Sequence, residues 1–252
     1  MKNLIAILIV VLLVSCENLY NTPDNDYWSC EQLSDATGLK LYPFVPFTDE
    51  EMRFMSYDYK LERRQIPEDF LQRMTTKELF YQVVCCDLSK DMLVFNTMQQ
   101  GFESVKRLNM LPELLNRPDA GHVLLEILRK VNPAQIKGSD CHWTCHCLNI
   151  TGAQPEVINR MTDEDIDDYI SQQLRCYDAI QSLDATNPEY HGVNVILFGL
   201  GNVMIRYEFE PFIQMLCNDP ITNELIWDTQ FITEQFALQV IDYIKQFKNR
   251  KK

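Results

Sequence analysis

The sequence predicts an all-α protein, either a multi-helix bundle or a helical array of the HEAT or armadillo kind. Glycine is scarce, at 8 of 252 residues, while leucine, isoleucine, glutamine and glutamate are frequent. Short apolar segments recur at the three- and four-residue spacing of a helix face, and helix-start signals stand before several of them. These observations together favour helices over strands.

Residues 1–15 have the layout of a secretory signal, in which one cation, Lys2, precedes the apolar run Leu4–Val14. That run is too short for a bilayer span, which takes ~20 apolar residues. It leads into Leu13-Val14-Ser15-Cys16, which resembles a bacterial lipobox. We therefore expect cleavage before Cys16 and attachment of acyl chains such as palmitate, which give a stable membrane anchor. The alternative is an ordinary cleaved signal in which Cys16 is incidental.

An acyl anchor would hold the exported protein in the cell envelope, and we expect the outer membrane rather than the inner one. The formal net charge of −13 excludes the broad basic surface that nucleic-acid binding needs. The same charge disfavours electrostatic contact with anionic lipid. The expected contacts are therefore a membrane, through the anchor, and a protein partner.

Residues 16–47 predict a tether, because several prolines interrupt regular structure there. Its second half, Leu39–Phe47, is apolar enough to lie against the body of the protein. An all-helical domain is then expected over residues 48–252.

Local signals place the helix starts. Thr48 followed by Glu51 is a capping box that opens a helix to about Arg64. The remaining predicted helices include 90–108, with Gly101 inside it or at a break, 141–151, 155–160, 163–181, 188–208 and one from about Thr229 onward.

A stronger signal is Met74-Thr75-Thr76-Lys77-Glu78-Leu79, where a capping box lies inside a hydrophobic staple. The same device recurs at Met161-Thr162-Asp163-Glu164-Asp165-Ile166, with Asp165 in place of the glutamate. The two blocks are 87 residues apart, which suggests two related multi-helix halves.

Three groups of motifs lie between residues 66 and 126. They are Ile66-Pro67 with Leu71, Met74-Thr75-Thr76 and Glu78-Leu79; Phe95-Asn96 with Gln99-Gln100-Gly101-Phe102-Glu103-Ser104-Val105; and Leu114-Leu115 with Arg117 and Asp119-Ala120-Gly121. Together they resemble a family of uncharacterised bacterial lipoproteins, and Gln154–Thr162 and, more weakly, Leu197–Met204 fit the same pattern. About a third of the chain is covered. The resemblance implies an all-helical exported protein and carries over no activity or functional residue.

The segment Cys141-His142-Trp143-Thr144-Cys145-His146-Cys147 holds the densest set of soft metal ligands, and this part of the chain departs from the family pattern. On a helix, Cys141 and Cys145 share one face, and His142 and His146 share the neighbouring face. Structural cysteines, reduced or in a disulfide, are the interpretation we favour for this segment.

Two metal alternatives remain for the same segment. A tetrahedral zinc site needs four converging ligands, which one helix seldom provides, so Cys176 or His122 would have to contribute. Covalent haem at Cys141, Cys145 and His146 is the other alternative, although the spacing is one residue too long for C-x-x-C-H.

Three further patterns favour structural explanations. Cys85 and Cys86 are neighbours in a predicted helix, where their side chains point ~100° apart, so a bond between them would need a distorted backbone. Gly199 and Gly201 lack the third glycine of a dinucleotide loop and favour a closely packed buried helix. The acidic run 163–168 lacks the calcium-loop order and suits the first turn of a helix.

No serine-hydrolase, zinc-protease or phosphate-loop motif occurs in the sequence. We therefore expect a membrane-anchored protein-interaction or envelope-assembly module without a cofactor. One alternative is a metal-binding protein or metal-dependent enzyme that uses residues 141–147. The other is a small-ligand-binding lipoprotein, which would need a deep pocket.

Overall fold

The computed structural model describes residues 34–35, 37–130, 139–181, 192–218 and 233–250, apart from the side chains of residue 52 and of 139–145. In this part of the chain every regular element is a helix and no strand occurs, so the predicted all-α fold is confirmed. None of these helices combines the length and the apolar character needed to cross a bilayer.

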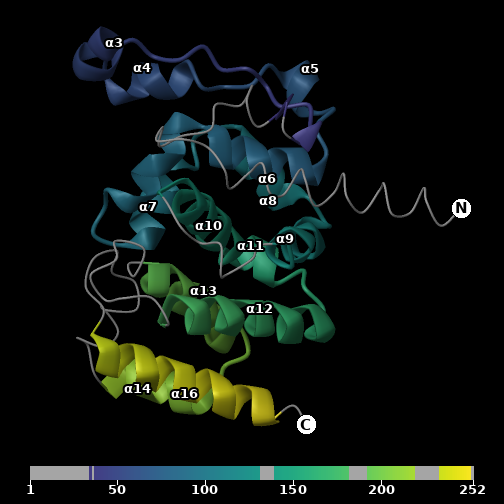
Figure 1. Cartoon of the computed structure of the whole chain (residues 1–252), viewed down its shortest axis with the longest axis vertical. Helices are drawn as coiled ribbons and strands as arrows, with labels where there is room; N and C mark the ends of the chain where they lie inside the picture. The colour runs from purple at the N-terminus through teal and green to yellow at the C-terminus, as the bar shows by residue number, and fades with distance from the viewer. Residues whose placement is uncertain (1–33, 36, 131–138, 182–191, 219–232, 251–252) are drawn as a thin grey trace, which may run out of the picture.

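The helices form layers that follow one another along the long axis of the molecule (Figure 1). Three short helices come first: α3 (Asp49–Phe54), α4 (Tyr57–Glu62) and α5 (Glu68–Leu71). The first layer holds α6 (Thr76–Cys85), the 3-10 helix η1 (Asp87–Leu93), α7 (Met98–Val105) and α8 (Met110–Asn116), and the second holds α9 (Ala120–Leu128), α10 (Ser139–Gly152) and α11 (Pro155–Ile158). The third layer holds α12 (Asp163–Gln181) and α13 (Val193–Arg206), and the fourth holds α14 (Glu210–Asn218) and α16 (Glu234–Arg250).

Each layer packs mainly on the layers before and after it. Helix α6 packs on α9 and α9 on α12, while α7 packs on α10, α10 on α13 and α13 on α16. Helix α13 is buried along most of its length between its neighbours. The described helices therefore form a stacked array, which is one of the two all-helical arrangements that the sequence predicts.

A short turn leads into each of the four layers, and an arginine lies at or next to each turn. These arginines are Arg73, Arg117, Arg160 and Arg206, with spacings of 44, 43 and 46 residues. Such spacings match the ~40–47 residues of HEAT and armadillo units. The 87-residue interval between the two capping-box blocks spans two layers. Each of the two halves that the sequence suggests therefore contains two layers, the first and second in one half and the third and fourth in the other.

Three of these arginines, Arg117, Arg160 and Arg206, form what we call the arginine ladder. Each donates hydrogen bonds to carbonyl oxygens at or next to the turn one layer earlier. The acceptors are Met74 for Arg117, Leu115 and Arg117 for Arg160, and Ile158, Asn159 and Met161 for Arg206. These carbonyls lie at or just beyond the ends of short helices, where a cation complements the helix dipole. The ladder thus couples each layer to the one before it.

Replacing Arg206 by alanine is expected to lower the free energy of unfolding by about 1.5–3 kcal/mol, because a charged donor to backbone carbonyls is lost. Urea denaturation followed by circular dichroism measures the change. Arg73→Ala is the matched control, since Arg73 pairs with the exposed Asp69 at 3.3 Å and should cost less than about 1 kcal/mol. Equal losses in the two variants would contradict a coupling role for the ladder.

Most local helix predictions are confirmed. The capping boxes of α3 and α6 both form, at Thr48 with Glu51 and at Thr75 with Glu78. Asp165 completes the third box, because it accepts hydrogen bonds from the amide and the hydroxyl of Thr162, at 3.1 and 2.8 Å. Helix α12 spans the predicted residues, Asp163–Gln181. The predicted start of the last helix near Thr229 lies outside the described residues.

Two predicted helices are interrupted. The helix expected from Thr48 to about Arg64 ends at Phe54, and Ser56 caps a new helix by accepting the Tyr59 amide at 3.3 Å. The helix expected over residues 90–108 consists of η1 and α7, because Thr97 caps α7 by accepting the Gln100 amide. In both cases a short hydroxyl side chain competes for the backbone and starts a new helix.

Candidate functional site

The cysteine- and histidine-rich segment lies on α10. The side chains of Cys141, His142 and Cys145 lie outside the described part, whereas His146 and Cys147 are buried, at 4% and 1% exposure. Among the side chains that are described, no three of His, Cys, Asp or Glu are grouped so as to hold a metal ion. The zinc and haem hypotheses therefore stay predictions.

The two residues expected to help a zinc site lie on different helices. His122 is on the exposed side of α9, with its Nε2 atom 3.5 Å from Glu126 and its Nδ1 atom 3.9 Å from Asp165 of α12. Cys176 is buried on α12. His122 therefore takes part in the contact between α9 and α12.

Two thiols in the α6–α10 region are poorly suited to act as nucleophiles. Burial, together with the nearby charge of Asp87, raises the pKa of Cys86 to about 12, and burial also raises the pKa of Cys147. A protonated thiol is a weak nucleophile and a weak metal ligand. Cys85 is disulfide-bonded and the adjacent Cys86 is not, so the two neighbours are not joined to each other. The prediction that both lie within a helix is wrong for Cys86, because α6 ends at Cys85 and the backbone of Cys86 is extended.

The remaining sequence motifs have structural roles. Gly199 lies within α13, where an added Cβ atom would approach the Tyr169 hydroxyl to 2.4 Å, so the predicted close packing of a buried helix is confirmed. The acidic run opens α12, and Asp168 pairs with Arg129 at 2.7 Å. At the start of α12, Asp165 therefore completes the cap, and Asp168 forms an ion pair with the preceding layer.

Residues 38–47, which we call the arm, lie against α5 and α6 without regular secondary structure. Leu41 is 6% exposed, so it belongs to the core although it lies outside the layers. The Tyr42 ring meets Phe70 of α5 and Phe44 of the arm edge-on, at centroid distances of 5.3 Å. Apolar contacts therefore fix the arm along its length.

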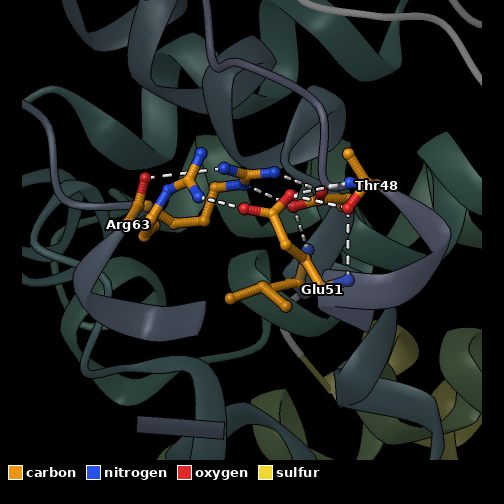
Figure 2. Close-up of polar contacts among 6 residues, drawn as sticks. Thr48, Glu51 and Arg63 are labelled. Atoms are coloured by element: carbon orange, nitrogen blue, oxygen red, sulfur yellow. Dashed lines mark hydrogen bonds and ion pairs between the residues drawn. The ribbon is translucent and has the colours of Figure 1, made fainter. Parts of the chain in front are cut away.

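A polar clamp fixes the end of the arm. Figure 2 shows the Glu51 side chain between Thr48 and Arg63. Glu51 accepts the Thr48 amide at 2.8 Å and pairs with Arg63 at 2.5 Å. The Thr48 amide and the Arg63 guanidinium lower the pKa of Glu51, so its carboxylate is ionised at neutral pH.

Arg64, beside this clamp, is a buried cation at 1% exposure. Its Nε and Nη2 atoms donate to the two carboxylate oxygens of Asp87, at 2.7 and 2.6 Å. Its guanidinium also lies over the Phe47 ring, 3.7 Å from the centroid. Arg64 therefore joins the arm to the start of η1 through a bidentate ion pair and a cation–π contact.

Several large apolar side chains of the described region remain exposed. Phe54 is 81% exposed, Val45 and Val94 are each 68% exposed, and Leu238 on α16 is 54% exposed. They add little to the core and are available for contact with another molecule.

Comparison with protein-family models, curated proteins and solved structures gives no match. Function therefore has to be inferred from the sequence and from the geometry described above. The resemblance to uncharacterised bacterial lipoproteins stays a prediction.

Proposed function

We propose that the protein is lipid-modified at Cys16, is held to a membrane of the cell envelope, and works as a protein-interaction or envelope-assembly module. The observation that carries the proposal is the stacked array of helices, because such arrays present a long surface that extended partners use. The Leu13-Val14-Ser15-Cys16 sequence supplies the anchor. The exposed side chains of Phe54 and Val94 add apolar contact area.

Cross-linking in intact cells, followed by isolation of the protein from solubilised membranes, tests this function. We expect one reproducible cross-linked partner and a fatty-acid label on the protein. The Cys16→Ser variant should lose both the label and its place in the membrane fraction, because no acyl chain can then hold it there. A wild-type protein without the label would contradict the anchor.

Metal content measured on the same sample separates the interaction function from the metal-binding alternative. Stoichiometric zinc or haem, with no reproducible partner, would overturn the interaction function in favour of the segment with Cys141, His142, Cys145 and His146. A co-purifying small molecule without a partner would favour the ligand-binding alternative.

A further inference from the structure

Two side chains of α6 hold the arm through its backbone. The Oε1 atom of Gln82 accepts the Tyr42 amide at 2.6 Å, and its Nε2 atom donates to the Tyr42 carbonyl at 3.2 Å. One helical turn earlier, Glu78 accepts the Lys40 amide at 2.9 Å. These bonds engage main-chain atoms that any residue other than proline offers, so they recognise a peptide and not a particular side chain.

The spacing of the two acceptors fits an extended peptide. Glu78 and Gln82 are four residues apart, a rise of about 6 Å along a helix. The Lys40 and Tyr42 amides are two residues apart, about 6.6 Å in an extended chain. Between them Leu41 turns into the core, while Lys40 stays exposed. Lys40 and Leu41 therefore lie in different environments, as neighbouring residues do in β-type peptide recognition.

The body of the protein holds the Glu78 acceptor in place. Glu78 also accepts the amide and the hydroxyl of Thr75, both at 2.8 Å, within the capping box of α6. Burial opposes ionisation of Glu78, but the Thr75 and Lys40 amides lower its pKa overall, so the acceptor is charged at neutral pH. The Thr75 contacts do not involve the arm, so they orient Glu78 whether or not the arm is bound, which reduces the ordering cost of binding.

We propose that the surface of α5 and α6 that the arm covers, which includes Phe70, Glu78 and Gln82 and which we call the groove, is a binding site for an extended peptide segment and that the arm occupies it in cis. The partner is a protein that presents an unstructured segment with a leucine followed by an aromatic residue, as in Leu41-Tyr42. Such a segment binds by displacing the arm. This inference rests on the interaction function proposed above and names the class of partner and what controls its access.

Because the arm is part of the same chain, it competes with a free peptide for this site. A segment attached through a short linker has an effective concentration of about 1 mM. The bound arm lowers the apparent affinity of the same peptide by the ratio of this effective concentration to the Kd of the peptide in trans. A variant with a displaced arm should therefore bind the peptide more tightly than the wild type.

The test uses the full-length protein in detergent and a fluorescein-labelled peptide of residues 37–48. Leu41→Asp should release the arm, because it would place a carboxylate in an apolar site. We expect this variant to bind the peptide in fluorescence polarisation at least tenfold more tightly than the wild type. Val45→Asp is the matched control, since Val45 is exposed on the same arm, and it should bind like the wild type.

Substitutions in the groove separate peptide recognition from nonspecific sticking. In the Leu41→Asp background, Gln82→Ala should weaken binding at least tenfold, whereas Gln72→Ala, on the exposed side next to α5, should not change it. A peptide with aspartate in place of the leucine should not bind. Equal binding by the groove variant and its control would overturn the proposal.

Hydrogen exchange in the wild type provides a second measurement that does not depend on Leu41→Asp folding. Millimolar peptide should speed exchange at the Lys40 and Tyr42 amides, and unchanged exchange would overturn cis occupancy. A concentration-dependent dimer cross-linked from arm to groove would assign the site to a second copy instead. Loss of peptide binding alongside a reproducible cross-linked partner would overturn this inference and leave the proposed function in place.

Discussion

Replacing Asp87 by alanine is expected to lower the free energy of unfolding by about 3 kcal/mol. Asp87 neutralises Arg64, which is 1% exposed, so the substitution would leave a buried guanidinium without its counter-charge. Breaking a buried pair in this way costs ~3–5 kcal/mol, and the lower end applies because the Asp87 side chain is 31% exposed. Urea denaturation of the wild type and the variant measures the difference.

Asp58 provides a control in an ion pair of similar length that is far less buried. Its ion pair with Arg107 is also short, at 2.7 Å, but both side chains are more than half exposed. Asp58→Ala should therefore cost less than about 1 kcal/mol. If both variants lost the same stability, burial of Arg64 would not be the cause.

Gly101→Ala is expected to be at least as damaging, with a loss of about 3 kcal/mol or more. The added Cβ atom would lie 1.9 Å from the carbonyl oxygen of Met92 and 2.6 Å from its carbonyl carbon. Both are backbone atoms of η1, so they cannot rotate away as a side chain can, and the two helices would have to separate. Thermal and urea unfolding of the purified variant measure the loss.

Gly152→Ala is the matched control for this prediction, because Gly152 also lies in a helix. Its added Cβ atom would meet Cδ2 of Leu124 at 2.3 Å, and that atom ends a flexible side chain. The expected loss is smaller, about 1–2 kcal/mol. A Gly101→Ala variant as stable as the wild type would show that η1 can move away from α7.

Much of the fold can be predicted from the sequence because its helix starts carry local chemistry. The boxes at Thr75 and Thr162 each need residues only three positions apart, so no tertiary information is required. The layer repeat is harder to see, because only the turns after Arg73 and Arg160 carry methionine and threonine. The turn after Arg117 carries Pro118 and Asp119, and the turn after Arg206 carries Tyr207 and Glu208. Asp119 makes no side-chain cap at the start of α9 and instead accepts a hydrogen bond from the Thr76 hydroxyl, at 2.6 Å.

The sequence does not predict that side chains of α6 hold the arm, and the reason is physical. Gln82 and Tyr42 are 40 residues apart, and a buried glutamine has no sequence pattern that shows which backbone it binds. What the sequence does predict is that Leu39–Phe47 lies against the body, because that stretch is apolar. Arg64 is a similar case, since a charged residue is expected at the surface until its partners, Asp87 and Phe47, are known.

The arginine ladder also has an evolutionary consequence. Arg117 and Arg160 lie 43 residues apart, and each donates a hydrogen bond to a backbone carbonyl one layer earlier. Duplication or excision of such a unit would again place an arginine beside the backbone carbonyls of the preceding layer. Relatives of this protein are therefore expected to differ in length by whole units of about 43 residues, with both ends of the molecule preserved.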